Sequence, residues 1–253
     1  VIEALERNSV IAVFWEGFEY GPRALGHRSF IANAASPKMK EILNTKIKHR
    51  EAYRPFAPIC LAEDFSSFFE SSHLEHEFMS YAVKAKSAAI DLVPSVVHHD
   101  GTARVQIATK DCGLIYELLN LWKVKNGYGI LINTSLNDND EPIVLDELDA
   151  LSCFLRTNCD MLILNEKMLD RRSVQSQIHE ISKKIETEIK QRNDIRFNES
   201  LEAILKNKTI EVKKYLKDYQ IISSYHKEYS TFIKLHKLIL MILNNEREKI
   251  DRC

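Results

Sequence analysis

The sequence lacks the cysteine pairs, long apolar runs and leader patterns that mark several classes of protein. Its five cysteines among 253 residues include no C-x-x-C pair, which argues against a zinc ribbon or a disulfide framework and suits a reducing compartment. Neither a run of about 18 apolar residues nor a basic N-terminal stretch before an apolar one is present, so no membrane span or signal peptide is predicted. We therefore expect a cytoplasmic protein without a membrane partner.

Glycine and proline are absent from the last part of the chain. All seven glycines lie at or before Gly129 and all six prolines at or before Pro142. Beyond this point apolar residues recur at spacings of three and four, beginning with Val174, Ile178, Ile181, Ile185 and Ile189. Without turn-forming residues, this period predicts helices that carry one apolar stripe. We expect residues 171–253 to form an all-helical tail that serves in docking or in a homo-oligomer.

Charge divides the chain at the same point. Residues 1–170 contain 17 Lys and Arg against 24 Asp and Glu, whereas residues 171–253 contain 18 against 12, although the net charge of the whole is only −1. The tail's acidic residues are interspersed with its basic ones, and its apolar stripe favours a protein partner over nucleic acid. We predict a domain of residues 1–170 followed by the tail. Because the chain begins with Val, we also expect it to be part of a longer protein.

Strand and helix patterns alternate through the first domain. Helices are expected at 1–8, 37–49, 64–70, 113–126 and 146–158. Strands are expected at 9–15, 29–34, 53–62, 78–83, 100–108, 130–135 and 160–169. Such alternation predicts an α/β or α+β ligand-binding domain, in which polar side chains gather at strand ends and in loops.

Four polar clusters have the chemistry of an anion site. They contain Arg23 and Arg28; Lys46, Lys48, Arg50 and Arg54; His98, Asp100, Thr102, Arg104 and Gln106; and Asn133, Thr134, Ser135 and Asn137. Guanidinium and ammonium groups beside hydroxyls and amides hold phosphate or carboxylate oxygens. Nearby glycines would let backbone N–H groups approach the same ligand. Together the clusters predict a small polyanionic ligand.

Each cluster also has an ordinary structural interpretation. Basic residues on the 37–50 helix are typical of a solvated face, and N-T-S at a strand end is a common cap. Adjacent histidines at 98 and 99 point to opposite sides of a strand, which favours surface histidines over a metal site. Spacing alone leaves both interpretations open.

Six segments, taken in order, resemble a known family. GPRALG with RS, N-x-x-I-K-x-R-E, RPFAP, H-x-DGTARVQ, NTS-x-N-x-x-x-EPIV and DAL-x-x-F-x-R are similar to the C-terminal, YrdC-like domain of the nodulation-protein-U type O-carbamoyltransferases. The resemblance covers residues 1–170 and implies a mixed twisted sheet with flanking helices. It further implies that this domain binds carbamoyl phosphate and ATP and forms carbamoyl adenylate. A separate N-terminal carbamoyltransferase domain with a metal site, which we expect this chain to lack, would transfer the carbamoyl group to a hydroxyl.

The resemblance also implies roles for individual residues. The expected catalytic residues are Lys48, Arg50 and Arg104. The expected substrate- and nucleotide-binding residues are Arg23, Arg28, Arg54, His98, Thr102, Asn133, Ser135 and Asn137. Mg²⁺ is expected to arrive with ATP, and no metal site is expected in this chain.

Two positions depart from the family pattern, and two other functions stay open. Glu16-Gly17 stands where Gly-Arg is usual, and Asn139-Asp140 stands where a basic residue and glycine are usual. Negative charge at either position would lower the affinity of an anion site if it pointed inward. The alternatives are a threonylcarbamoyl-adenylate synthase of related fold and a non-catalytic interaction module with a decayed pocket.

Overall fold

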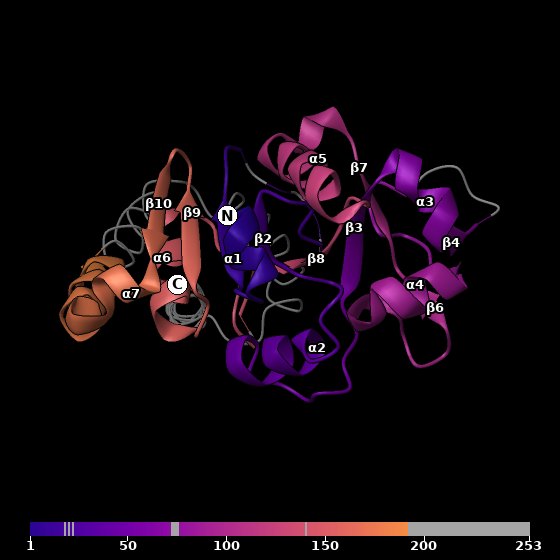
Figure 1. The fold of residues 1–253 in the computed structure, drawn as a ribbon. Helices are drawn as coiled ribbons and strands as arrows, with labels where there is room; N and C mark the ends of the chain where they lie inside the picture. Colours follow the sequence, from indigo (N-terminus) through magenta and orange to yellow (C-terminus); the bar gives the residue numbers. More distant parts are fainter. Residues whose placement is uncertain (18, 20, 22, 72–75, 140, 192–253) are drawn as a thin grey trace, which may run out of the picture. The chain divides into compact units, whose positions relative to one another are not determined.

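The computed structural model describes residues 1–17, 19, 21, 23–71, 76–139 and 141–191 (Figure 1). Two compact units are present, Val1–Ser182 and Lys183–Cys253, and most of the second lies outside the described residues. The predicted helical tail therefore stays a prediction from residue 192 onward. In the described part of the chain, no helix is both long enough and apolar enough to cross a membrane.

A seven-stranded mixed sheet forms the centre of the first unit. Its order is β10-β9-β1-β2-β8-β3-β7, and only the β1–β9 and β3–β7 pairs are parallel. The strands are β1 (Ile11–Phe14), β2 (Arg28–Ala32), β3 (Ala57–Leu61), β7 (Gln106–Ala108), β8 (Ile130–Ser135), β9 (Met161–Leu164) and β10 (Lys167–Asp170). Their residues are mostly apolar, which suits strands that are covered on both faces, and β1, β2 and β3 are buried at every position. The expected α/β class with a mixed sheet is confirmed.

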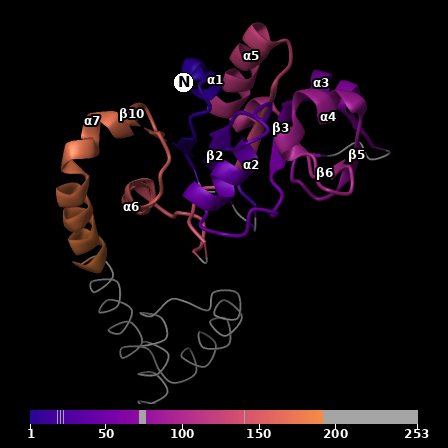
Figure 2. The same cartoon turned by 60° about the horizontal axis from the view of Figure 1, so that its bottom comes forward.

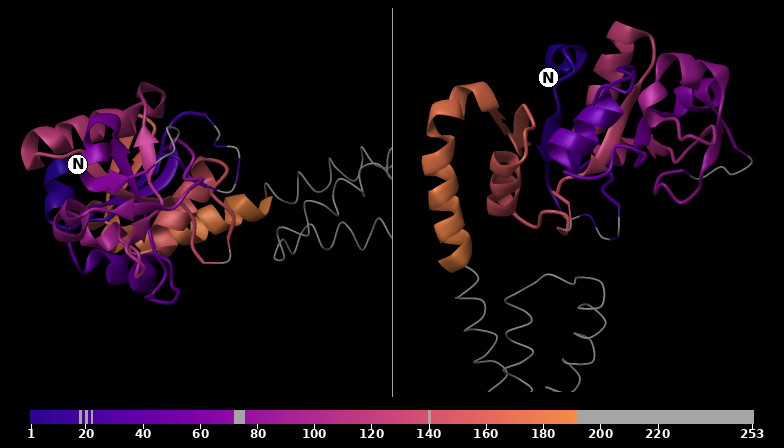
Figure 3. Two further views of the ribbon diagram at one scale, coloured as in Figure 1. Left: turned by 90° about the vertical axis from the view of Figure 1, so that its right-hand side faces the viewer. Right: turned by 90° about the horizontal axis from the view of Figure 1, so that it is seen from below.

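Helices lie on both sides of this sheet (Figures 1 and 3). On one side are α1 (Ile2–Glu6) and α5 (Leu114–Asn126), whose apolar residues form one core with β1, β3 and β8. On the other side is α2 (Met39–Ile42), which continues as the π-helical turn η1 (Leu43–Ile47). The helix predicted at 37–49 thus begins two residues later, at Met39, and its last turn is a π-helix, which is wider than an α-helix. π-Helical turns are rare in proteins, and many of those that occur lie at functional sites.

A second, smaller sheet follows β3. It contains β4 (Phe69–Glu70), β5 (Val83–Ala85) and β6 (Thr102–Ala103), and it lies with α3 (Ala62–Phe68) and α4 (Ser87–Leu92) at one end of the main sheet (Figure 2). The 3₁₀ turns η2 (Pro94–Val96) and η3 (Lys110–Cys112) complete this region. The predicted strand at 100–108 is therefore two strands in two sheets, because the chain leaves β6 before it enters β7.

The end of the first unit differs from its prediction. Residues 160–169 form a hairpin of β9 and β10 rather than one strand, and Asn165 turns the chain with a left-handed φ of 51°. Asparagine tolerates that conformation better than most residues. Before the hairpin lies α6 (Glu147–Arg156), which is capped by the Asp146 carboxylate; this carboxylate accepts from the N–H of Asp149 at 3.1 Å. Beyond the hairpin lie α7 (Arg171–Val174) and η4 (Gln175–Gln177).

Arg171 connects the residues after the hairpin to α6. Its guanidinium donates to the carbonyl of Cys159 at 2.6 Å and to those of Phe154 and Thr157, and it lies 4.7 Å from the centroid of the Phe154 ring. The last carbonyls of α6 thereby gain the donors that a helix end lacks. The domain boundary at residue 170 stays a prediction, but this contact makes Arg171 part of the sheet domain.

We predict that Arg171→Ala lowers the free energy of unfolding by about 1–3 kcal/mol, because it leaves buried carbonyls without donors. Arg172→Ala is the matched control. The Arg172 side chain is 83% exposed and, among the described residues, pairs with Asp170 at 2.8 Å, so its loss should leave the free energy of unfolding nearly unchanged. Chemical denaturation of both variants provides the measurement, and equal effects would contradict the prediction.

Candidate functional site

The end of β8 connects two of the predicted clusters. Asn133 and Ser135 point to the same face, since alternate residues of a strand do so. The Asn133 amide donates to Gln106 Oε1 at 2.7 Å and to the carbonyl of Ala24 at 3.0 Å. The Gln106 amide in turn donates to the carbonyl of Leu25 at 2.7 Å. The GPRALG segment is therefore held against β7 and β8 by buried amide side chains.

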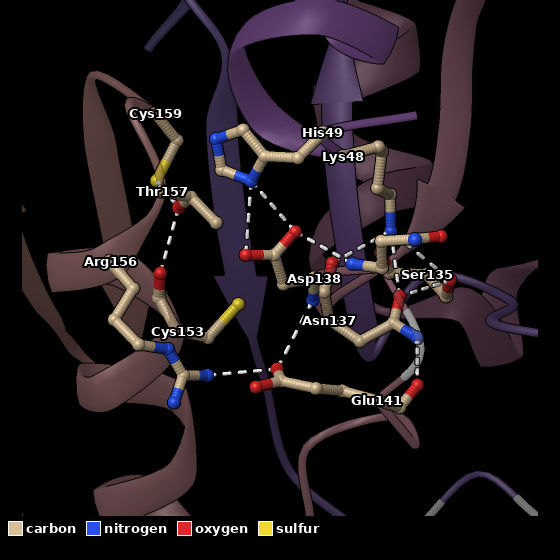
Figure 4. Close-up of polar contacts among 11 residues, drawn as sticks. Lys48, His49, Ser135, Asn137, Asp138, Glu141, Cys153, Arg156, Thr157 and Cys159 are labelled. Atoms are coloured by element: carbon tan, nitrogen blue, oxygen red, sulfur yellow. Dashed lines mark hydrogen bonds and ion pairs between the residues drawn. The ribbon is translucent and has the colours of Figure 1, made fainter. Parts of the chain in front are cut away.

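Lys48 makes hydrogen bonds to the same strand end (Figure 4). Its side chain follows η1 and is 3% exposed. Its Nζ donates to the carbonyls of Ser135 and Asn137 at 2.5 and 2.9 Å and to Asn137 Oδ1 at 2.7 Å. Ser135 Oγ donates to that same Oδ1 at 2.6 Å. Lys48, Ser135 and Asn137, predicted from segments far apart in the sequence, thus form one hydrogen-bonded group.

Burial dominates the titration of Lys48. Removal of the ammonium from water lowers its pKa to about 7, and repulsion from Arg50 adds to that shift. The nearby Cys153, Asp138 and Glu141 act in the opposite direction but do not offset burial. The charge of this side chain can therefore change near neutral pH in response to a bound anion.

The loop after Ser135 is fixed by contacts that the sequence did not reveal (Figure 4). His49 Nδ1 lies 2.9 Å from Asp138 Oδ1, and His49 has a left-handed φ of 44°. The Asn137 amide donates to the carbonyl of Glu141 at 2.6 Å, and the Glu141 carboxylate accepts from the Arg156 guanidinium at 2.8 Å. The turn after η1 is thus held against the loop after β8 by two neighbouring contacts, Lys48 with Asn137 and His49 with Asp138.

Arg50 and Arg54 continue the positive charge from Lys48. Arg50 Nε donates to Asn44 Oδ1 at 2.8 Å, and its guanidinium lies 5.0 Å from the Phe56 ring centroid. Burial and then repulsion from Arg54 lower the Arg50 pKa. Arg54 is exposed and pairs with Glu51 at 3.3 Å. Lys46 of the same cluster is exposed, as the solvated-face interpretation predicted.

Arg23 and Arg104 form a second positive group. Burial lowers the Arg104 pKa, and repulsion from Arg23 lowers it further. The buried Nε of Arg104 has no acceptor. Across the described residues, neither guanidinium makes a hydrogen bond or an ion pair with the protein. Two neighbouring cations without a protein anion are the feature that an anionic ligand would complete.

His98 and Thr102 lie next to this second group. Burial lowers the His98 pKa, and Arg104 and Lys40 lower it further against the opposing effect of Asp100. Thr102 Oγ1 donates to Asp100 Oδ1 at 2.7 Å and lies 3.2 Å from His98 Nδ1. His98, Thr102 and Arg104 thus lie near one another, and their predicted contacts with a ligand stay predictions.

Arg28 is placed differently from the other predicted residues. It is 4% exposed, and its guanidinium donates to the carbonyls of Trp15, Glu16 and His27 at 2.9–3.1 Å and lies 3.5 Å from the Phe14 ring centroid. Its donors thus face the backbone, and its predicted ligand contact stays a prediction. This role was not predicted, and neither was that of Glu19, whose carboxylate accepts hydrogen bonds from the backbone N–H groups of residues 25, 27 and 28.

The two departures from the family pattern are only partly visible. The Glu16 side chain is exposed and makes no hydrogen bond or ion pair with the residues that the structure describes. Solvent therefore screens its charge. Asp140 lies outside the described residues.

Neither a metal centre nor a reactive thiol is found in the described part of the chain. No group of three or more His, Cys, Asp and Glu side chains there could hold a metal ion. Burial raises the pKa of the Cys153 thiol to about 12 and that of the Cys159 thiol to about 11. These thiols stay protonated at neutral pH and are poor nucleophiles.

Known proteins are similar to part of this chain. Nodulation protein NolNO of Sinorhizobium fredii is 40% identical over 158 residues, which are 61% of this chain and 23% of that protein. Nodulation protein U of Rhizobium tropici is 42% identical over 120 residues, 47% of this chain and 20% of that protein. The 3'-hydroxymethylcephem-O-carbamoyltransferase of Streptomyces clavuligerus is 36% identical over 162 residues, 63% of this chain and 30% of that protein. The chain thus spans less than a third of each relative's length.

One solved structure is also similar. Full-length HypF in the phosphate- and nucleotide-bound form has 21% identity and a TM-score of 0.47, over 65% of this chain and 24% of that one. The family described as the carbamoyltransferase C-terminus matches residues 2–172, in agreement with the six ordered segments. The chain belongs to the carbamoyltransferase C-terminus family.

Proposed function

We propose that this chain is the adenylate-forming part of an O-carbamoyltransferase. It binds MgATP and carbamoyl phosphate and forms carbamoyl adenylate, and an N-terminal domain passes the carbamoyl group to a hydroxyl. Family membership and the carbamoyltransferase named among the relatives support this proposal. These names favour transfer to a hydroxyl over threonylcarbamoyl adenylation, and the intact hydrogen bonds of Lys48 argue against a decayed pocket.

The observation that carries the proposal is the uncompensated charge of Arg23 and Arg104. Each guanidinium repels the other, and no carboxylate of the described residues pairs with either. A triphosphate would relieve this repulsion and supply hydrogen-bond acceptors for both guanidinium groups. Arg104 lies on the chain between β6 and β7, and its buried Nε has no acceptor among the described residues.

The proposed reaction joins a carbamate oxygen to the α-phosphorus of ATP. Water releases inorganic phosphate from carbamoyl phosphate, the carbamate oxygen then bonds to the α-phosphorus, and the bond to the β-phosphate oxygen breaks with its electrons on pyrophosphate. In this scheme Arg23 and Arg104 hold the departing phosphates. Lys48 and Arg50 offset the charge of the pentavalent phosphorus. Ser135 and Asn137 orient Lys48, and no covalent intermediate on the protein is required.

We predict that the purified chain releases pyrophosphate when it is given ATP, Mg²⁺ and carbamoyl phosphate. Lys48→Ala should lower that rate by at least about 100-fold, because it removes a fixed positive charge from the reacting phosphorus. Lys46→Ala is the matched control, since Lys46 lies two residues away and is exposed, and its rate should not change. Absence of heat from both MgATP and carbamoyl phosphate in titration calorimetry would contradict the proposal.

The pKa of Lys48 predicts two opposite trends with pH. Anion binding favours the ammonium, so above a pKa of about 7 the affinity for MgATP should fall by up to about tenfold per pH unit. The unfolded chain keeps the proton up to about pH 10, so it binds more protons than the folded chain across that window. The free energy of unfolding should therefore rise with pH from about 7 to about 10.

Calorimetry and denaturation from about pH 7 to about pH 9 measure these two trends. Lys48→Met should show neither, because it has no proton to lose. Wild-type curves that are parallel to those of Lys48→Met in both experiments would show that Lys48 does not titrate in this range.

A further inference from the structure

We infer that Glu19 is a positioning residue, which holds the backbone of residues 23–28 so that Arg23 is presented beside Arg104. The inference rests on the proposed function, because it concerns the same anion site. Glu19 does not face the ligand in this account. It acts through the backbone of the segment that carries Arg23.

The Glu19 carboxylate accepts hydrogen bonds from three backbone N–H groups. Oε1 accepts from the N–H of Leu25 at 2.6 Å and of His27 at 2.9 Å, and Oε2 accepts from the N–H of Arg28 at 3.0 Å. Converging backbone N–H groups of this kind form a concave anion-binding surface. Here a carboxylate of the chain itself occupies that surface. The bonds are charge-assisted and so are stronger than bonds between neutral groups.

The turn inside this segment requires glycine. Gly26 has a left-handed φ of 126°, and its N–H donates to Ser29 Oγ at 3.1 Å. A Cβ at this position would approach Ile115 Cγ1 at 3.1 Å. The segment therefore packs closely on α5, and the carboxylate closes it from the other end.

Arg28 carries the opposite charge to Glu19 and binds the opposite kind of backbone group. Its guanidinium donates to the carbonyls of Trp15, Glu16 and His27, whereas Glu19 accepts from N–H groups. The negative and the positive side chain thus satisfy backbone groups of both kinds at the base of the segment. Unpaired buried backbone groups are costly, so this arrangement specifies one conformation.

Arg23 lies within the segment that these two side chains hold. It is exposed and is repelled by Arg104. The three bonds of Glu19 hold the backbone that follows Arg23 in place before an anion binds. Pre-organisation of this kind raises affinity, because less conformational freedom is lost on binding.

A double-mutant cycle on the full chain tests the inference. Glu19→Gln keeps the size of the side chain but removes the charge, and we expect MgATP affinity, measured by calorimetry, to fall about tenfold. In an Arg23→Ala background, Glu19→Gln should cause no further loss, since the two residues act as a unit. Additive losses in the cycle would show a merely structural role and would overturn the inference.

Glu16→Gln is the matched control, because it removes the same charge three residues earlier in the chain without touching the three N–H groups. It should not weaken MgATP binding, and an equal loss in both variants would overturn the inference. A second readout is independent of the ligand. The amide signals of Leu25, His27 and Arg28 in the NMR spectrum should shift in Glu19→Gln and not in Glu16→Gln. Wild-type protein that fails to bind MgATP would refute the proposed function, whereas unshifted signals would refute the role of Glu19.

Discussion

The burial of the Lys48 ammonium against the end of β8 is the interaction on which the site depends. A buried cation is costly unless oxygens surround it, and here three oxygens of residues 135 and 137 do so. That requirement fixes the π-helical turn before Lys48 relative to the loop after β8. The contacts of His49 with Asp138 and of Glu141 with Arg156 follow from the same placement. The cost of burial appears as a pKa near 7, which links the geometry of the site to its charge.

The order of the sheet explains why separate segments meet at one place. β8 lies between β2 and β3, so its end is adjacent to the segment before β2 and to the turn before β3. Asn133 on β8 holds the first through Gln106 and Ala24, and Ser135 holds the second through Lys48. Lys48 thereby brings positive charge to this strand end, while Arg23 and Arg104 pair with no carboxylate of the residues that the structure describes. Such an arrangement favours a polyanion with several phosphates over a single small anion.

The sequence predicted the elements whose signals are local. The apolar spacing of residues 113–126 predicted α5 correctly to its last turn, and Asp146 marked the start of α6. The grouping of Lys48 with Ser135 and Asn137 was implied by the family resemblance, and the structure places the three together. The roles of Arg28 and Glu19 were not predictable, because bonds from a side chain to distant backbone leave no periodic pattern. The β9–β10 hairpin was missed for a similar reason, since its turn depends on one residue with positive φ.

The most direct test of this account is a crystal structure of the full chain with a non-hydrolysable ATP analogue, Mg²⁺ and carbamoyl phosphate. The account predicts that the β- and γ-phosphates contact Arg23 and Arg104, and that the α-phosphate lies within hydrogen-bonding distance of Lys48 or Arg50. Phosphates bound away from all four side chains would contradict it.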